Sequence, residues 1–82
     1  MITAHQMKAA RALLGIDQRT LAAASGVSLP TIRRMETSQE NVRANVDTLV
    51  KVISALEEAG IELIGEGAAS LKGGRGVRII SQ

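Results

Sequence analysis

The chain is 82 residues long, carries a formal net charge of +2, and contains no aromatic residue and no cysteine. This length suits one domain, or one domain with an appendage, and leaves no room for a second core. Without aromatic rings the protein has no platform for base stacking, which excludes single-strand binders and RNA-recognition modules that depend on stacking. Without cysteine it has no disulfide framework, no thiolate nucleophile and no cysteine-ligated zinc.

The sequence also lacks the patterns of a membrane or secreted protein. No apolar run approaches the roughly 18 residues of a membrane span, and residues 1–4 lack the charged start and apolar stretch of a signal peptide. The single histidine, His5, cannot by itself form a metal site or a catalytic triad, so we expect it at the surface. We therefore expect a cytoplasmic protein with no membrane partner, no metal and no cofactor.

The charges are unevenly distributed along the chain. Residues 1–44 contain six basic and three acidic residues, residues 45–66 one and five, and residues 67–82 three and none. A basic segment beside an acidic one favours one face for a polyanion and another face for a different contact. Ordinary solvated surface charge remains the alternative.

Four helices are predicted, because four segments with apolar residues at three- and four-residue spacing each follow a side chain that can cap a helix. Glycine follows three of them, where it suits the C-terminal stop. In the third helix Pro30 falls in the first turn, where its missing N–H would bond nothing in the helix. The expected helices are residues 4–14 after Thr3, 18–24 after Asp17, 29–36 after Ser28, and a fourth that starts after Asn45 or Asp47 and ends at Gly60.

After Gly60 the sequence changes to β-branched, partly alternating segments bounded by glycines, which predicts two strands, 61–64 and 77–80, joined as a β-hairpin. The glycine-rich stretch 73–76 does not match a phosphate-binding loop, because GxxxxGK followed by Ser or Thr is absent. Opposite charges on the two strands could set the register, and the candidate pairs are Glu62 with Arg78 or Glu66 with Arg75.

The segment 18–37 holds the most informative pattern: a short helix, a tight glycine turn and a second helix. Two helices that cross steeply need a small residue at their contact, a positive φ in the turn, and apolar residues that lock the inner face. Ala22, Gly26 and Ile32 meet these three needs in order. The lock is completed by Leu21, Val27 and Met35.

This pattern, with the helices on either side of it, resembles the helix-turn-helix of the lambda-repressor-like family, also called the XRE family of regulators. The resemblance covers residues 4–59 and is carried by residues 14–22, 25–28 and 31–36. It implies a mainly α fold in which residues 1–59 form a compact four-helix DNA-binding domain. Residues 60–82 would then be a C-terminal β-hairpin that serves as a dimerisation element.

The resemblance places the third helix in the major groove and the second helix across the phosphate backbone. Arg34 is the expected base reader, because a guanidinium can donate twice to guanine, and Arg33 could do the same or bind phosphate. Leu29 and Pro30, where many relatives have polar side chains, offer only apolar contact to a thymine methyl. The full set of expected DNA-binding residues is Gln18, Arg19, Ser28, Leu29, Pro30, Thr31, Arg33, Arg34, Asn41 and Arg43.

Arg11 and Glu36 match family positions that form a partly buried ion pair between the first and third helices. We therefore interpret both as structural, since breaking one side of such a pair strands a charge.

The function that follows from the resemblance is sequence-specific binding of double-stranded DNA by a transcriptional regulator, most simply a dimeric repressor of a palindromic operator. A hairpin with Ile64, Ile79 and Ile80 would leave exposed apolar surface and unpaired edges, which a second copy could cover. The alternative is that the hairpin folds back on its own helices. A second functional alternative is an antitoxin or adaptor that binds a partner protein through the acidic stretch 47–66 and the hairpin. We expect no enzyme, because no nucleophile–base pair, metal-ligand cluster or nucleotide loop is present.

Overall fold

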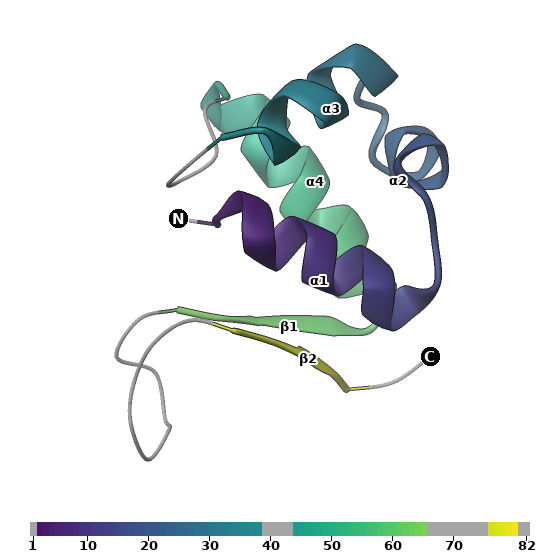
Figure 1. The fold of residues 1–82 in the computed structure, drawn as a ribbon, viewed down its shortest axis with the longest axis vertical. Helices are drawn as coiled ribbons and strands as arrows, with labels where there is room; N and C mark the ends of the chain where they lie inside the picture. Colours follow the sequence, from purple (N-terminus) through teal and green to yellow (C-terminus); the bar gives the residue numbers. More distant parts are fainter. Residues whose placement is uncertain (1, 39–43, 66–75, 81–82) are drawn as a thin grey trace.

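The computed structural model describes residues 2–38, 44–65 and 76–80, which form four helices followed by a two-stranded antiparallel hairpin (Figure 1). The elements are α1 (Ala4–Leu14), α2 (Gln18–Ser25), α3 (Leu29–Glu36), α4 (Val46–Glu58), β1 (Ile61–Ile64) and β2 (Gly76–Ile79). The predicted mainly α fold with a C-terminal hairpin is confirmed. Helix α2 ends one residue later than predicted, and β2 is shifted one residue toward the N-terminus.

Side chains next to the helices fix where each one begins. For α4 the structure decides between the two candidate caps, because Oδ1 of Asn45 accepts a hydrogen bond from the Thr48 N–H at 2.8 Å. Gly15 and Gly26 follow α1 and α2 with φ of 70° and 72°, a left-handed conformation that side chains with a Cβ rarely adopt. The predicted caps of the first three helices are confirmed as Thr3, Asp17 and Ser28.

The core lies between the helices and the hairpin and is wholly aliphatic. Every helix contributes to it, and so does the first residue of β1, which is only 2% exposed. Because the core has no aromatic rings, its irregular gaps are filled in part by methionine, whose side chain is flexible. The largest fully buried side chains are Met7, Leu21, Ile32, Met35, Val52, Leu56 and Ile61.

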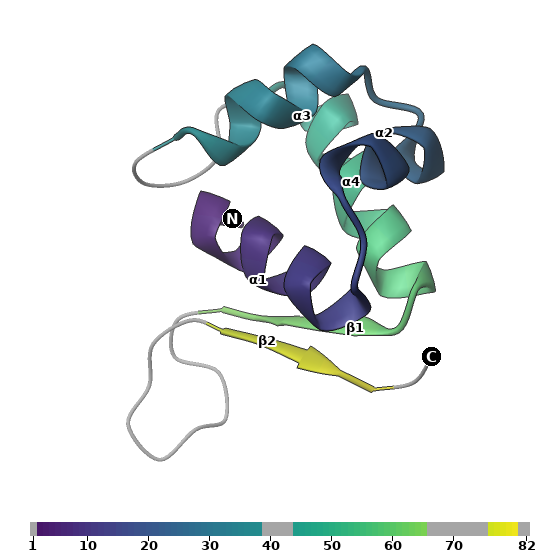
Figure 2. The same ribbon diagram turned by 45° about the vertical axis from the view of Figure 1, so that its right-hand side comes forward.

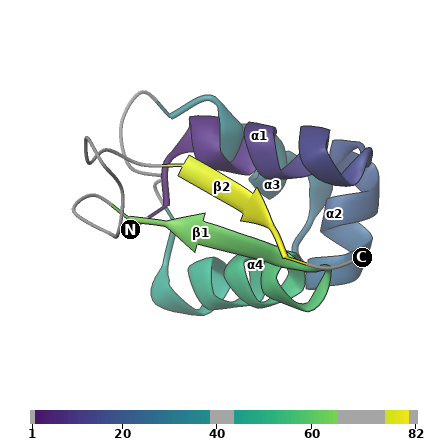
Figure 3. The same ribbon diagram turned by 90° about the horizontal axis from the view of Figure 1, so that it is seen from below.

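The hairpin packs against its own helices, with β2 along α1 and β1 along α4 (Figure 3). Ile61 pairs with Ile79 and Leu63 with Val77, and these four side chains face the core. Glu62 lies opposite Arg78 on the outer side, and their charged groups are 3.4 Å apart, which confirms one of the two expected cross-strand pairs. The alternative pair, Glu66 with Arg75, lies outside the described residues.

The structure thus adopts the arrangement that the sequence left as an alternative, in which the hairpin folds back. Of the three isoleucines expected at an exposed surface, Ile79 faces the core, Ile64 is half-buried, and Ile80 is 64% exposed. The tail therefore has a structural role within one chain, whatever else its outer surface binds.

Gln6 holds the loop end of the hairpin, where β1 ends and β2 begins, against α1. Its Nε2 donates to the carbonyl oxygens of Ile64 and Gly76, each at 3.0 Å. Its Oε1 accepts from the Thr3 N–H at 2.9 Å, while the Gln6 N–H donates to the Thr3 hydroxyl at 3.1 Å, completing a capping box. One buried amide therefore joins the start of α1 to both strands.

Candidate nucleic-acid interface

Helices α2 and α3 are joined by a short, rigid turn, as the helix-turn-helix pattern predicts (Figure 2). The Ser25 hydroxyl donates to the Leu21 carbonyl at 2.8 Å and accepts from the Val27 N–H at 3.3 Å. Leu21 and Val27 are buried beside Ile32 of α3. Since the turn is closed by hydrogen bonds and its inner face by apolar contacts, α3 has a fixed orientation relative to α2.

The two faces of α3 differ sharply in exposure. Ile32, Met35 and Glu36 are buried, whereas Arg33 and Arg34 are exposed. Among the other predicted DNA-binding residues here, Ser28 and Pro30 are exposed, while Leu29 and Thr31 are half-buried.

At the first turn of α3 the Ser28 hydroxyl donates to the Thr31 hydroxyl oxygen at 2.8 Å. The same Ser28 oxygen caps the helix by accepting from the Thr31 N–H at 3.4 Å. The Ser28 hydroxyl thus donates its hydrogen bond within the protein, and the Thr31 hydroxyl can donate a hydrogen bond to another group. An acceptor such as a phosphate oxygen or a base edge fits that requirement.

A shallow polar depression of about 220 Å³ lies where the start of α2 meets α3. The exposed side chains of Arg19 and Arg33 border it, together with the half-buried Leu29. Asp17 and Gln18 complete the lining. The structure therefore brings four predicted site residues together around one hollow, and Arg34 is not among the residues that line it.

Asp17 is a charged member of the depression that sequence reasoning treated only as a cap. Its Oδ1 accepts from the Thr20 N–H at 2.7 Å, and this hydrogen bond, aided by the charge of Arg19, lowers the pKa of the carboxyl. The site consequently holds one carboxylate beside two guanidinium groups. The carboxylate also satisfies an N–H at the positive end of α2, where an anion is favoured.

Beneath this surface Arg11, Glu36 and Gln18 form one hydrogen-bonded network. Arg11 binds Glu36 through two parallel bonds, Nε to Oε2 and an η-nitrogen to Oε1, both 2.7 Å long. The hydrogen bonding of the Arg11 guanidinium to the Glu36 carboxylate, which accepts, is the main reason that the pKa of Arg11 is raised above its ordinary value. The expected ion pair between α1 and α3 is therefore present, and the Glu36 side chain is only 2% exposed.

Gln18 takes part in this network as well, which the sequence did not reveal. Its Nε2 donates to Oε1 of Glu36 at 3.0 Å, so the amide that was expected on a phosphate also ties α2 to the ion pair. No sequence signal pointed to this contact, because the two residues lie on different helices and are brought together by the turn. The other two predicted residues, Asn41 and Arg43, lie outside the described residues.

Within residues 2–38, 44–65 and 76–80 no three His, Asp or Glu side chains are grouped so as to hold a metal ion. His5 is exposed, as expected. No helix in those same ranges has the length and apolar character needed to cross a membrane.

Comparison with known proteins agrees with the geometry of α2 and α3. A family model described as Helix-turn-helix (HTH_3) matches residues 7–63, which is more than half of the chain. The matched range begins at Met7 within α1, includes α2, α3 and α4, and ends at Leu63 in β1. No curated protein matches the chain.

Proposed function

The chain belongs to the lambda-repressor-like (XRE) helix-turn-helix family of DNA-binding regulators, and we propose that it is a dimeric repressor that reads a palindromic operator with α3. The observation that carries the proposal is the exposed face of α3. Its two arginines lie on the outside of a helix whose other face is locked by buried apolar residues and by the Arg11–Glu36 pair. A rigid helix with exposed guanidinium groups suits the major groove of a duplex.

The two arginines of α3 receive different roles because they have different neighbours. Arg33 borders the depression with Arg19 at the positive end of α2, a combination that suits a phosphate of the DNA backbone. Arg34 is exposed but does not line the depression, so it is free to donate to O6 and N7 of a guanine.

The first turn of α3 supplies the remaining contacts. Leu29 and Pro30 can meet a thymine methyl, and the Thr31 hydroxyl, held by Ser28, can donate to an acceptor. Gln18 keeps a second amide hydrogen beyond the one it gives to Glu36, and this hydrogen can reach a phosphate. Asn41 and Arg43 are assigned to the phosphate backbone on the family resemblance alone.

The small size of the reading unit supports the proposed dimer. One helix of eight residues contacts few base pairs, and two copies related by a two-fold axis would place their α3 helices in successive major grooves about 34 Å apart. Occupation of such a site over a promoter would block transcription. We assign the contact between copies to α4 and the hairpin, which lie away from the reading helix in sequence and carry exposed apolar residues.

Selection of bound sequences from a random duplex pool is the first test, and recovery of a palindrome is the expected result. Arg34→Ala should weaken binding to the selected duplex more than to random duplex, and by about tenfold or more. Arg33→Ala should weaken both equally and reduce the slope of binding against salt by about one phosphate contact. Lys51→Ala, an exposed cation on α4, is the matched control and should change neither. Equal losses on both duplexes for Arg34→Ala would refute its role as a base reader.

A second function is favoured by the acidic residues on the last three elements. Asp47, Glu57 and Glu58 are exposed on α4, and Glu62 lies on the outer side of β1. In this alternative the chain is an antitoxin or adaptor that grips a basic partner protein with this surface and binds DNA for autoregulation. Co-purification of a basic protein encoded beside this gene would support it. Loss of that complex on reversing the charges of Glu57 and Glu58, with DNA binding kept, would locate the contact.

A further inference from the structure

Helix α4 carries an apolar stripe that faces solvent. Val46 is 72% exposed and Val50 is 55% exposed, although both are large and aliphatic. Ile53 and Glu57 continue the same side of the helix, since spacings of four, three and four residues keep side chains on one face. We call Val46, Val50, Ile53 and Glu57 the α4 stripe. The neighbouring side of the helix, with Leu49, Val52 and Leu56, is buried in the core, and Ile53 is partly buried against it.

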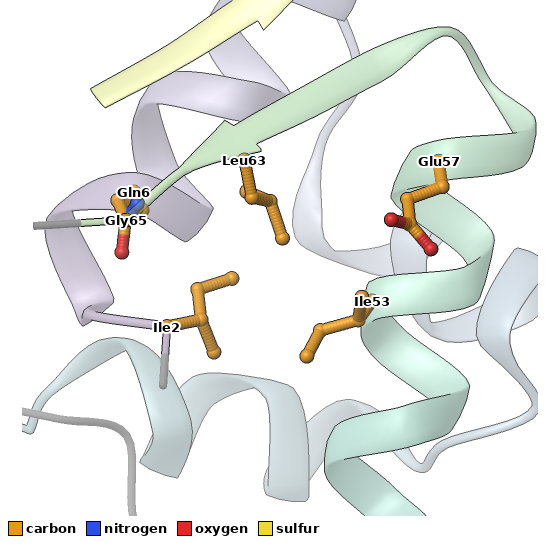
Figure 4. Close-up of a pocket in the computed structure, with 6 residues that line it drawn as sticks. All are labelled: Ile2, Gln6, Ile53, Glu57, Leu63 and Gly65. Atoms are coloured by element: carbon orange, nitrogen blue, oxygen red, sulfur yellow. The ribbon is translucent and has the colours of Figure 1, made fainter. Parts of the chain in front are cut away.

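The second half of the α4 stripe borders a cavity of about 240 Å³ between α1, α4 and β1. Ile2, Ile53 and Leu63 point into this space, and Glu57 lies at its edge with its carboxylate toward the cavity (Figure 4). Gln6 also lines the cavity, but its side-chain amide already makes three hydrogen bonds to the backbone of the same chain. The cavity therefore offers apolar walls to an aliphatic side chain.

We propose that a second copy of this chain covers the α4 stripe, with the two α4 helices antiparallel about a two-fold axis. The spacings in the stripe, four, three and four residues, are the same from either end. In two antiparallel copies each member of the stripe therefore lies opposite the corresponding member counted from the other end. An axis midway between Lys51 and Val52 places each Val50 on the partner's Ile53, and each Val46 at the cavity beside the partner's Glu57. A two-fold contact needs a surface that is complementary to itself in this way.

Charge supports the antiparallel direction. Glu57 and Glu58 lie in the last turn of α4, at the negative end of its dipole, and no basic residue in that turn compensates them. Antiparallel packing brings these carboxylates near the positive N-terminus of the partner's α4, which also carries Asp47, so each end of the paired helices would hold three carboxylates. Parallel packing would instead place the four carboxylates together, which like-charge repulsion opposes.

This interface rests on the dimer in the proposed function, but not on the roles of individual DNA-binding residues. Its members come from α1, α4 and β1, so α2 and the outer face of α3 stay uncovered. We expect association to be weak and to depend on concentration, because one helix face with a small cavity offers few contacts beside a standard interface of roughly 800 Å² per partner.

Sedimentation of the full chain without DNA, across a series of concentrations, is the first experiment. The parent should shift from monomer toward dimer as concentration rises, and Val50→Glu should weaken association at least tenfold because it buries a charge against Ile53. Leu13→Glu is the matched control, since Leu13 on α1 is a 44% exposed aliphatic residue outside the α4 stripe, and it should associate like the parent. Circular dichroism checks that both variants fold. A dimer that is unchanged by Val50→Glu would overturn this interface while leaving a dimeric repressor intact.

Cross-linking tests whether the two α4 helices are antiparallel. Because the sequence contains no cysteine, only the introduced cysteines can react. Val46→Cys chains mixed with Glu57→Cys chains should be joined by a short thiol cross-linker. Either variant alone should not be, because the two copies of one position would lie about 16 Å apart along the axis at 1.5 Å per residue. Cross-linking of Val46→Cys to itself would show parallel helices and overturn the proposal. A parent that is monomeric at all concentrations would overturn it too, whereas the Arg34→Ala comparison on DNA would still test the reading helix separately.

Discussion

Replacement of Glu36 by alanine should destabilise the protein strongly while leaving the exposed face of α3 chemically unchanged. The carboxylate accepts two bonds from Arg11 at 2.7 Å and one from Gln18 at 3.0 Å, and Glu36 is only 3% exposed. Its removal leaves a guanidinium and an amide without their partner. Breaking one side of a buried ion pair costs about 3–5 kcal/mol. Because the Arg11 side chain is 19% exposed and can recover some contact with water, we expect the lower end, about 3 kcal/mol.

For a domain of this size each kcal/mol lowers Tm by about 4–8 °C, so the melting temperature should fall by about 12–24 °C. Thermal unfolding followed by far-ultraviolet circular dichroism measures this, since the chain has no aromatic residue to report by fluorescence. Glu58→Ala on the exposed end of α4 is the matched control and should melt like the parent.

The Arg11–Glu36 network also predicts how the two substitutions combine, which the same thermal unfolding assay measures. Arg11→Ala combined with Glu36→Ala should cost little more than Glu36→Ala alone, because residues in one network lose the same interaction only once. A Glu36→Ala protein that melts within about 2 °C of the parent would refute the reasoning. Fully additive losses for the two substitutions would refute the coupling.

Three further perturbations test other parts of the structure. Gln6→Ala removes the amide that joins α1 to both strands, and should cost about 2 kcal/mol and speed hydrogen exchange in the hairpin before the helices; equal acceleration everywhere would argue against a local clamp. Gly26→Ala places a Cβ on a residue with φ of 72°, and no atom lies within 4 Å of that position. Backbone strain alone should therefore lower the free energy of unfolding by about 1 kcal/mol, measured by urea unfolding. Unchanged stability would contradict the left-handed conformation. Asp17→Asn removes a carboxylate whose pKa the Thr20 N–H lowers below its ordinary 3.8. Because folding lowers that pKa, the parent should have a larger free energy of unfolding than Asp17→Asn at pH values above the unfolded-state pKa. This difference in stability should disappear as the pH falls through the folded-state pKa, and a difference that stays constant with pH would contradict the prediction.

Local features of the fold were readable because their determinants lie within a few residues of each other. A cap such as Ser28 acts on an N–H three residues away, and Gly26 alone sets the left-handed turn between α2 and α3. The bounds of α1, α3 and β1 were therefore predicted correctly. Helix α2 ends one residue later than predicted, β2 is shifted by one residue, and α4, expected to end at Gly60, ends at Glu58.

The ion pair between Arg11 and Glu36 was predicted by a different route. The two residues are 25 positions apart, and the resemblance to a known family suggested their contact where periodicity could not. The assignment of single residues to DNA contacts also comes from the resemblance, and it stays a set of predictions for binding experiments.

Some features were decided only by the tertiary structure. The contacts of Gln6 with the hairpin span 58 and 70 residues, and the bond from Gln18 to Glu36 joins two helices across a turn. A polar side chain at an apolar helix face has no preferred partner until the chain brings one near. The sequence alone thus determined the helices, the N-caps of the first three and the absence of stacking rings, whereas the cap of α4 was left between Asn45 and Asp47. Packing decided that the hairpin closes the core of its own chain, because burying Ile61 and satisfying the Gln6 amide are gains that exist only when distant segments meet.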